Sequence, residues 1–139
     1  MSDFNEKPSD EKLSDEKPAL ERSKTILIIE DDEGIREGFS MLLEFEGYTV
    51  LTASNGKEGL EVLHRGQRPC MIVLDLMMPV MNGLEFLEVV NQDSTLATIP
   101  VVLVTAFHDR TNLVKWPIQI LKKPVDYDLL MSAVKKYCY

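Results

Sequence analysis

Polar and charged residues stand directly after four short apolar runs of the sequence, and their types and spacing suit chemistry. Carboxylates held close together repel one another, so their pKa values rise or they bind a cation. A cluster of oxygen ligands completed by water suits Mg²⁺. A lysine and a hydroxyl beside such a cation suit a phosphoryl group, whose oxygens they would stabilise during transfer. The residues are Glu30, Asp31 and Asp32 after the first of these runs, then Asp75, Thr105 and Lys123 after the later ones.

Asp75 taken with its neighbours alone allows two interpretations. It follows the apolar run 71–74, which is typical of a strand buried on both faces of a parallel sheet. Ligands bind at the carboxyl ends of such strands, but an aspartate before a turn, here marked by Asn82, also serves as a cap. The acids after the first run, together with Thr105 and Lys123, favour the binding site.

The apolar patterns indicate strands that alternate with helices, and the helix between the last two strands is expected to be shortened or irregular. Such alternation predicts an α/β fold with a parallel five-stranded sheet and helices on both faces. We expect the flavodoxin-like, doubly wound strand order 2-1-3-4-5, which brings the polar residues to one edge. The predicted strands cover 25–29, 48–53, 71–74, 101–105 and 118–122; the predicted helices cover 35–46, 56–65 after Asn55, 84–90, and a last one after Asp126.

Composition limits the classes of function. The 139 residues suffice for one domain, and the net charge of −8 argues against direct nucleic-acid binding, which requires a basic surface. No apolar run approaches the roughly 20 residues that cross a bilayer, and the N-terminus lacks the apolar region of a signal peptide. We therefore expect no membrane insertion and a cytoplasmic location. Residues 1–24 are interpreted as a disordered charged tail and residues 25–139 as the domain.

The two cysteines are Cys70 and Cys138. Two cysteines at this separation indicate neither a disulfide framework nor a metal site. We interpret Cys70 as an ordinary core residue and Cys138 as a terminal thiol.

The chain resembles the receiver domain of bacterial response regulators. The resemblance covers 25–139 and rests jointly on Glu30-Asp31, the stretch 74–83, Thr105-Ala106 and Lys123-Pro124. Asp32 lies outside the motif, and we interpret it as stabilising the first turn of a helix. The resemblance implies Asp75 as the phosphoacceptor, Thr105 and Lys123 as its catalytic partners, and Glu30, Asp31, Asp75 and the backbone carbonyl of Met77 as ligands of Mg²⁺.

The resemblance implies a signalling phosphoacceptor that is an enzyme only towards itself. Asp75 would receive a phosphoryl group from a histidine kinase or a phosphotransfer protein in a Mg²⁺-dependent reaction. The domain would catalyse only its own phosphorylation and dephosphorylation. Because no output domain follows Tyr139, we expect the signal to pass by contact with a downstream protein that the sequence does not identify.

The segment 106–120 departs from the family pattern. It is shorter than usual, lacks a Gly-Ala pair and has Ile120 where an aromatic residue is usual. Isoleucine has no ring that could move between buried and exposed positions. We therefore predict a modified output surface in which Phe107 or Trp116 reports the state of the site.

Two apolar residues near the predicted site, Met77 and Phe107, have no group that could orient an attacking water by hydrogen bonding. They lie two residues beyond Asp75 and Thr105. We therefore predict that the phosphorylated form hydrolyses slowly.

Three alternatives were weighed against a phosphorylated receiver. A degenerate receiver that acts as a phosphorylation-independent docking module is the strongest of them, and it rests only on the atypical segment 106–120. A haloacid-dehalogenase-like phosphatase needs a second aspartate where Met77 stands. A flavodoxin needs a Ser/Thr/Gly-rich phosphate loop, whereas this chain has Glu30-Asp31 there.

Overall fold

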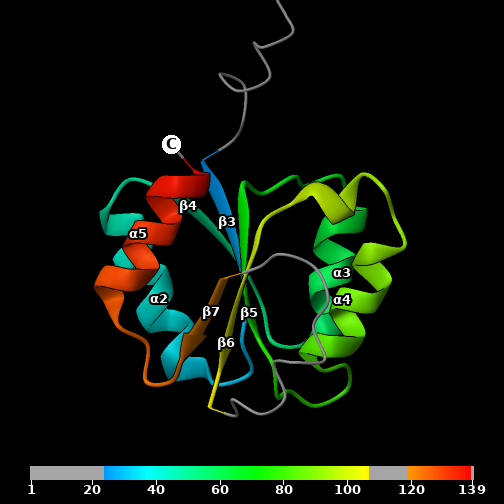
Figure 1. Ribbon diagram of the computed structural model, residues 1–139, viewed down its shortest axis with the longest axis horizontal. Helices are drawn as coiled ribbons and strands as arrows, with labels where there is room; N and C mark the ends of the chain where they lie inside the picture. Colours follow the sequence, from blue (N-terminus) through cyan, green and yellow to red (C-terminus); the bar gives the residue numbers. More distant parts are fainter. Residues whose placement is uncertain (1–23, 107–118, 139) are drawn as a thin grey trace, which may run out of the picture.

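The computed structural model describes residues 24–106 and 119–138, which form a parallel sheet between two layers of helices (Figure 1). The strands lie in the order β4-β3-β5-β6-β7, so the predicted order 2-1-3-4-5 is confirmed. Residues 1–23, including most of the predicted tail, and residues 107–118, including the predicted irregular helix, lie outside the described residues. The strands are β3 (Thr25–Ile29), β4 (Thr49–Ala53), β5 (Met71–Asp75), β6 (Val101–Thr105) and β7 (Gln119–Lys122).

The helices flank the sheet in two pairs. Helices α2 and α5 lie on one side, and α3 and α4 lie on the other (Figure 1). The predicted caps Asn55 and Asp126 are confirmed, and Asp32 caps α2 by accepting a hydrogen bond of 2.9 Å from the amide of Ile35. The α-helices are α2 (Glu33–Phe45), α3 (Gly56–His64), α4 (Gly83–Asn91) and α5 (Tyr127–Tyr137), and a 3-10 helix covers Leu96–Thr98.

The central strands are buried on both faces, which explains their continuous apolar sequence. Alternate residues of β3 enter different cores: Leu27 packs in the cluster under α3 and α4, and Ile28 packs in the cluster under α2 and α5. β5 lies beside β3, and all five of its residues are buried, Asp75 included. Packing on both faces of the sheet therefore fixes the position and direction of the strand that ends in this aspartate.

Phe45 is an apolar residue of α2 that does not face the core. Its side chain is 87% exposed, whereas Phe39 and Leu43 of the same helix are buried. A helix turns about 100° per residue, so a position two residues beyond Leu43 points to the opposite side.

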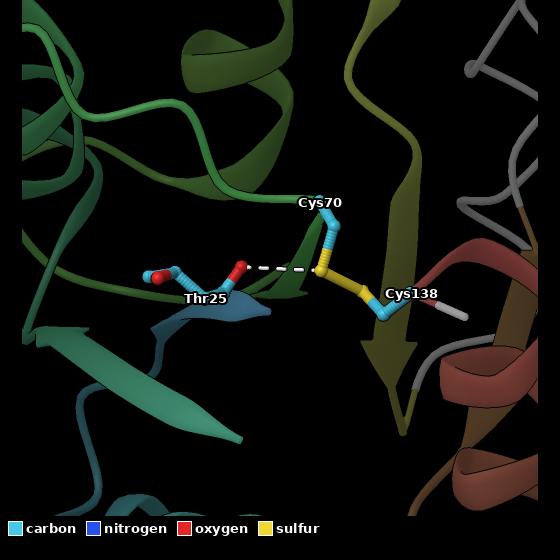
Figure 2. The surroundings of a disulfide bond; sticks show 3 residues. All are labelled: Thr25, Cys70 and Cys138. Carbon is cyan, nitrogen blue, oxygen red and sulfur yellow. Dashed lines mark hydrogen bonds between the residues drawn. A yellow bond between two sulfur atoms is a disulfide. The ribbon is translucent and has the colours of Figure 1, made fainter. Parts of the chain in front are cut away.

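Cys70 is buried in the core, as predicted, but the interpretation of Cys138 as a terminal thiol was wrong. Cys70 and Cys138 form a disulfide, with their Cα atoms 5.4 Å apart (Figure 2). Cys70 precedes β5, and Cys138 caps the end of α5. Because α5 returns along the sheet after β7, its last turn reaches the edge where β5 begins.

No described helix is long and apolar enough to cross a membrane.

Candidate functional site

Three carboxylates meet where β3 and β5 end. The two strands are paired in parallel, with Ile29 opposite Leu74, so the residues that follow these two positions are neighbours. Oxygen atoms of Glu30, Asp31 and Asp75 lie within 4.8 Å of one another. Glu30 and Asp75 are buried, whereas Asp31 is exposed. The cluster thus has two carboxylates fixed by the core and a third that opens to solvent.

Lys123 joins this cluster from the other side of the sheet edge. Its Nζ atom lies 3.3 Å from Oε1 of Glu30 and 3.4 Å from Oδ1 of Asp75. Its backbone amide donates a hydrogen bond of 2.9 Å to the carbonyl of Thr105, which ties the end of β7 to the end of β6. Thr105 itself is 1% exposed. The predicted site residues therefore lie at a common edge of the sheet, and the structure brings Glu30, Asp31, Asp75 and Lys123 together.

Burial and charge perturb the titration of this cluster. Burial of its carboxyl, followed by the charge of Glu30, raises the pKa of Asp75 to about 7 against the opposing effect of Lys123. Burial acts to lower the pKa of Lys123, but the charges of Asp75 and then Glu30 outweigh it, so that pKa is raised. Lys123 therefore carries a positive charge, and it does not neutralise three carboxylates.

This donor set fits a hard divalent cation. All three side chains offer carboxylate oxygens, which suit Mg²⁺ better than soft metals. Besides burial, the charge of Glu30 raises the pKa of Asp75, and the charge of Lys123 does not fully offset these effects. A cation bound among these oxygens would favour the ionised form of Asp75.

Arg36 supports the acidic turn, and sequence reasoning did not assign it a role. Its Nη1 atom donates a hydrogen bond of 2.8 Å to the carbonyl of Glu30. The amide of Asp32 donates a hydrogen bond of 3.1 Å to the carboxylate of the same glutamate. An arginine near a helix N-terminus, where acids are preferred, is the signal that points to such a role.

The loop after β5 packs closely against the phosphoacceptor candidate. A Cβ atom at Gly83 would lie 2.6 Å from the carbonyl oxygen of Asp75, so only glycine fits there. Asn82 and Glu85 form a capping box that begins α4 directly beyond this contact. The amide of Met77 lies 3.4 Å from Oδ1 of Asp75, which places this residue next to the cluster. Coordination by the Met77 carbonyl stays a prediction.

A cavity of about 660 Å³ opens beside Lys123, between α2 and the segment that leads into α5. Two glycines, Gly34 and Gly38, face it from α2 and leave the helix surface flat there. Tyr127 closes its far side and packs edge-on against Phe39, with their ring centroids 6.2 Å apart. The lining residues are Asp32, Gly34, Ile35, Gly38, Phe39, Lys123, Pro124, Val125 and Tyr127.

Comparison with known proteins identifies relatives over most of the chain. DivK, a polar-differentiation response regulator of Brucella anthropi, is 32% identical over 118 residues, which cover 82% of this chain and 95% of the relative. The transcriptional regulatory protein CrdR of Helicobacter pylori is 36% identical over 118 residues, or 82% of this chain and 54% of the relative. The chain spans only 38% and 34% of two further transcriptional regulators.

A solved structure shows the same fold. The signal receiver domain of a histidine kinase from Syntrophus aciditrophicus superposes with a TM-score of 0.76 at 30% identity, covering 82% of this chain and 89% of that one. The family model of the response regulator receiver domain matches residues 26–135, which include most of β3, all of β4 to β7 and most of α5. This protein therefore belongs to the response regulator receiver domain family.

Proposed function

We propose that this domain accepts a phosphoryl group on Asp75 from the phosphohistidine of a histidine kinase or a phosphotransfer protein, with Mg²⁺ as its cofactor. The observation that carries the proposal is the meeting of a buried aspartate, two further acids and one lysine at the carboxyl edge of the sheet. Glu30, Asp31 and Asp75 would hold the metal, joined by the Met77 carbonyl. The bound ion supplies positive charge that offsets repulsion between carboxylate and phosphoryl group.

The transfer step follows from the positions of the chain's own groups. A carboxylate oxygen of Asp75 attacks phosphorus, the new P–O bond replaces the P–N bond, and the donor imidazole leaves. Burial raises the pKa of the metal-free Asp75 carboxyl to about 7, and a bound cation would favour the ionised carboxylate that attacks. Lys123, already 3.4 Å from the nucleophile's Oδ1 atom, stabilises charge on the transferred group. The hydroxyl of Thr105 then binds the phosphoryl group in the product.

The cavity beside Lys123 supports the choice of a protein donor. It is bordered by Lys123 and by the flat stretch of α2 at Gly34 and Gly38. A helix that carries a phosphohistidine needs such a smooth surface to bring its imidazole close to Asp75. We therefore propose this cavity as the docking site of the donor, which also implies a cytoplasmic location, where kinases find ATP.

Slow hydrolysis of the phosphorylated form stays part of the proposal. Met77 stands next to the cluster with a 45% exposed thioether side chain, which gives an attacking water no strong hydrogen-bond partner. The second predicted residue, Phe107, lies outside the described residues, as does Trp116. Ile120 lies in β7 and is 38% exposed, so it borders the surface through which we propose that a downstream protein reads the phosphorylated state.

Incubation with acetyl phosphate and Mg²⁺, followed by intact-mass measurement, tests the proposal. We expect one added phosphoryl group on the parent protein and none on Asp75→Asn. Asp128→Asn is the matched control, since Asp128 is exposed on α5, and it should behave as the parent. An unmodified parent in the presence of Mg²⁺ would favour the phosphorylation-independent docking module instead.

A further inference from the structure

The disulfide lies at the opposite end of β5 from the acidic cluster. Cys70 is the residue before β5, and Asp75 is its last residue. Five residue steps separate Cys70 from Asp75, so at roughly 3.3 Å per residue their Cα atoms are about 16 Å apart. Cys138 reaches this edge as the C-terminal cap of α5 (Figure 2). The sulfur pair therefore joins the last turn of α5 to the start of the strand that carries the phosphoacceptor candidate.

The surroundings of the pair accommodate both oxidation states. Both cysteines are buried, at 4% and 1% exposure, and pack in the same apolar cluster as Val134. The Sγ atom of Cys70 lies 3.3 Å from the carbonyl oxygen of Thr25 (Figure 2). A disulfide sulfur has no hydrogen to donate, whereas a reduced thiol has one and finds this acceptor in place. Reduction thus leaves an apolar pocket for two neutral thiols and a hydrogen bond for one of them.

We propose that Cys70 and Cys138 form a reversible redox site that exchanges with low-molecular-weight disulfides and thiols. A cytoplasmic protein meets a reducing thiol pool, where a disulfide forms transiently under oxidation. The Cys138 thiolate attacks the disulfide RSSR, forming a mixed disulfide and releasing RS⁻. The Cys70 thiolate then attacks the Cys138 sulfur and releases the second RS⁻. The two protons from the cysteines convert these thiolates into two RSH molecules, so the exchange is balanced.

The end of α5 gives the reagent its access. Cys138 is held at the helix end by a hydrogen bond of 2.7 Å from its amide to the carbonyl of Val134. Helix ends fray readily, and opening this turn takes the Cys138 sulfur out of the core. Cys70 is fixed more firmly, because it directly precedes β5, which is paired with β3 on one side and with β6 on the other. Cys138 is therefore the first cysteine to react.

Oxidation should anchor α5 to the sheet. In the described structure this helix is held on one face by Leu130, Ala133 and Val134, whereas Tyr127 and Leu129 are about half exposed. The cross-link removes the frayed states of its last turn. Oxidation thus determines how often α5 opens at this end, and it does so without any contact with Asp75.

Hydrogen exchange on the full chain in two redox states tests the proposal. One sample is equilibrated with glutathione disulfide and the other with reduced glutathione, and each is alkylated under denaturing conditions to count its thiols by mass. We expect no alkylated cysteine in the first sample and two in the second, with full interconversion. Amides of residues 134–138 should exchange at least tenfold faster in the reduced protein than in the oxidised protein.

The double variant Cys70→Ala/Cys138→Ala provides the matched control. Its α5 amides should exchange as in the reduced parent and ignore the oxidant. Two free thiols after oxidation, a stable mixed disulfide with glutathione, or equal α5 exchange in both redox states would each overturn the proposal. The main comparison is between the oxidised and reduced states of the parent protein, so the test stands even if the double variant fails to fold. No step depends on phosphorylation, so failure here and failure of the proposed function are separable.

Discussion

Replacing Asp75 by asparagine should stabilise the metal-free protein, and more so as the pH rises. The pKa of this carboxyl is raised from 3.8 to about 7, chiefly by burial and by the charge of Glu30. Between these two pH values the folded protein binds a proton that the unfolded chain has lost. The free energy of unfolding therefore falls as the pH rises from about 4 to about 7 and is level above that range. Asparagine keeps the shape of the side chain and removes this titration.

The magnitude follows from the two pKa values. A difference of about 3 pKa units corresponds to about 4 kcal/mol at roughly 1.4 kcal/mol per unit. Only about a third of this cost is already present at pH 5, because pH 5 lies little more than one unit above the pKa of this carboxyl in the unfolded chain. The advantage of Asp75→Asn over the parent should therefore grow by about 2 to 3 kcal/mol between pH 5 and pH 8. In a domain of this size that is a difference of roughly 10 °C in Tm.

Urea denaturation in the presence of a chelator, at pH 5 and pH 8, measures this difference. Glu61→Gln serves as the control, because Glu61 is exposed on α3 and is not part of the acidic cluster. Mg²⁺ should restore stability to the parent at pH 8 and act far less on Asp75→Asn, since a bound cation favours the ionised carboxylate. An advantage of the variant that is the same at pH 5 and pH 8 would refute the reasoning, because Asp75 would then titrate as an ordinary carboxyl.

Three further variants test other parts of the site. Gly83→Ala should lower the free energy of unfolding by more than about 2 kcal/mol in urea denaturation, because its Cβ would lie 2.6 Å from the carbonyl oxygen of Asp75; a neutral effect would contradict the close approach. Gly38→Arg should abolish phosphorylation by a phosphorylated histidine phosphotransfer domain yet leave labelling by acetyl phosphate intact. This result is expected because the new side chain would fill the cavity beside Tyr127, and parallel loss of both activities would argue against a docking role. Met77→Asn should speed the decay of the phosphorylated protein several-fold, as followed by intact mass, because an amide can orient water; an unchanged rate would show that Met77 does not limit hydrolysis.

The site was predictable because it depends on strand ends, which the sequence marks clearly. Apolar runs located β3 and β5, and a parallel sheet places the carboxyl ends of its strands along one edge. Glu30 and Asp75 therefore had to be neighbours once the strand order was right. Lys123 joined them because β7 lies in the same sheet with the same direction.

The features that sequence reasoning missed depend on side-chain direction and on helix course. Arg36 binds the carbonyl of Glu30 from one turn into α2, and nothing in the apolar pattern distinguishes it from a solvated arginine. Phe45 is apolar but points away from the core, because it lies two residues beyond the buried Leu43 and therefore on the opposite side of the helix. The cysteines are 68 residues apart, and only the return of α5 along the sheet brings them together.

Oxidation of the cysteine pair and ionisation of Asp75 act on the same strand with opposite signs and comparable sizes. Closing a loop of 68 residues stabilises a domain by about 4 kcal/mol on chain-entropy grounds, which is close to the cost of ionising Asp75. The two sites lie roughly 16 Å apart along β5, beyond the range of about 10 Å within which effects on stability usually couple. The stabilisation by Asp75→Asn should therefore be the same in oxidised and reduced protein at pH 8, to within about 0.5 kcal/mol, when urea denaturation is carried out without metal.

A larger difference would mean that the sheet and α5 transmit strain between the two ends of the strand. Helix α5 lies between the two sites, since it begins three residues after Lys123-Pro124 and has Cys138 as its C-terminal cap. If anchoring its end moved Lys123 relative to Asp75, the charge balance of the acidic cluster would change with oxidation. The pH dependence of the parent would then differ between the two redox states, whereas independent sites give parallel curves displaced by a constant amount. Comparing the two curves thus decides whether the disulfide only stabilises the domain or also affects the proposed phosphorylation site at Asp75.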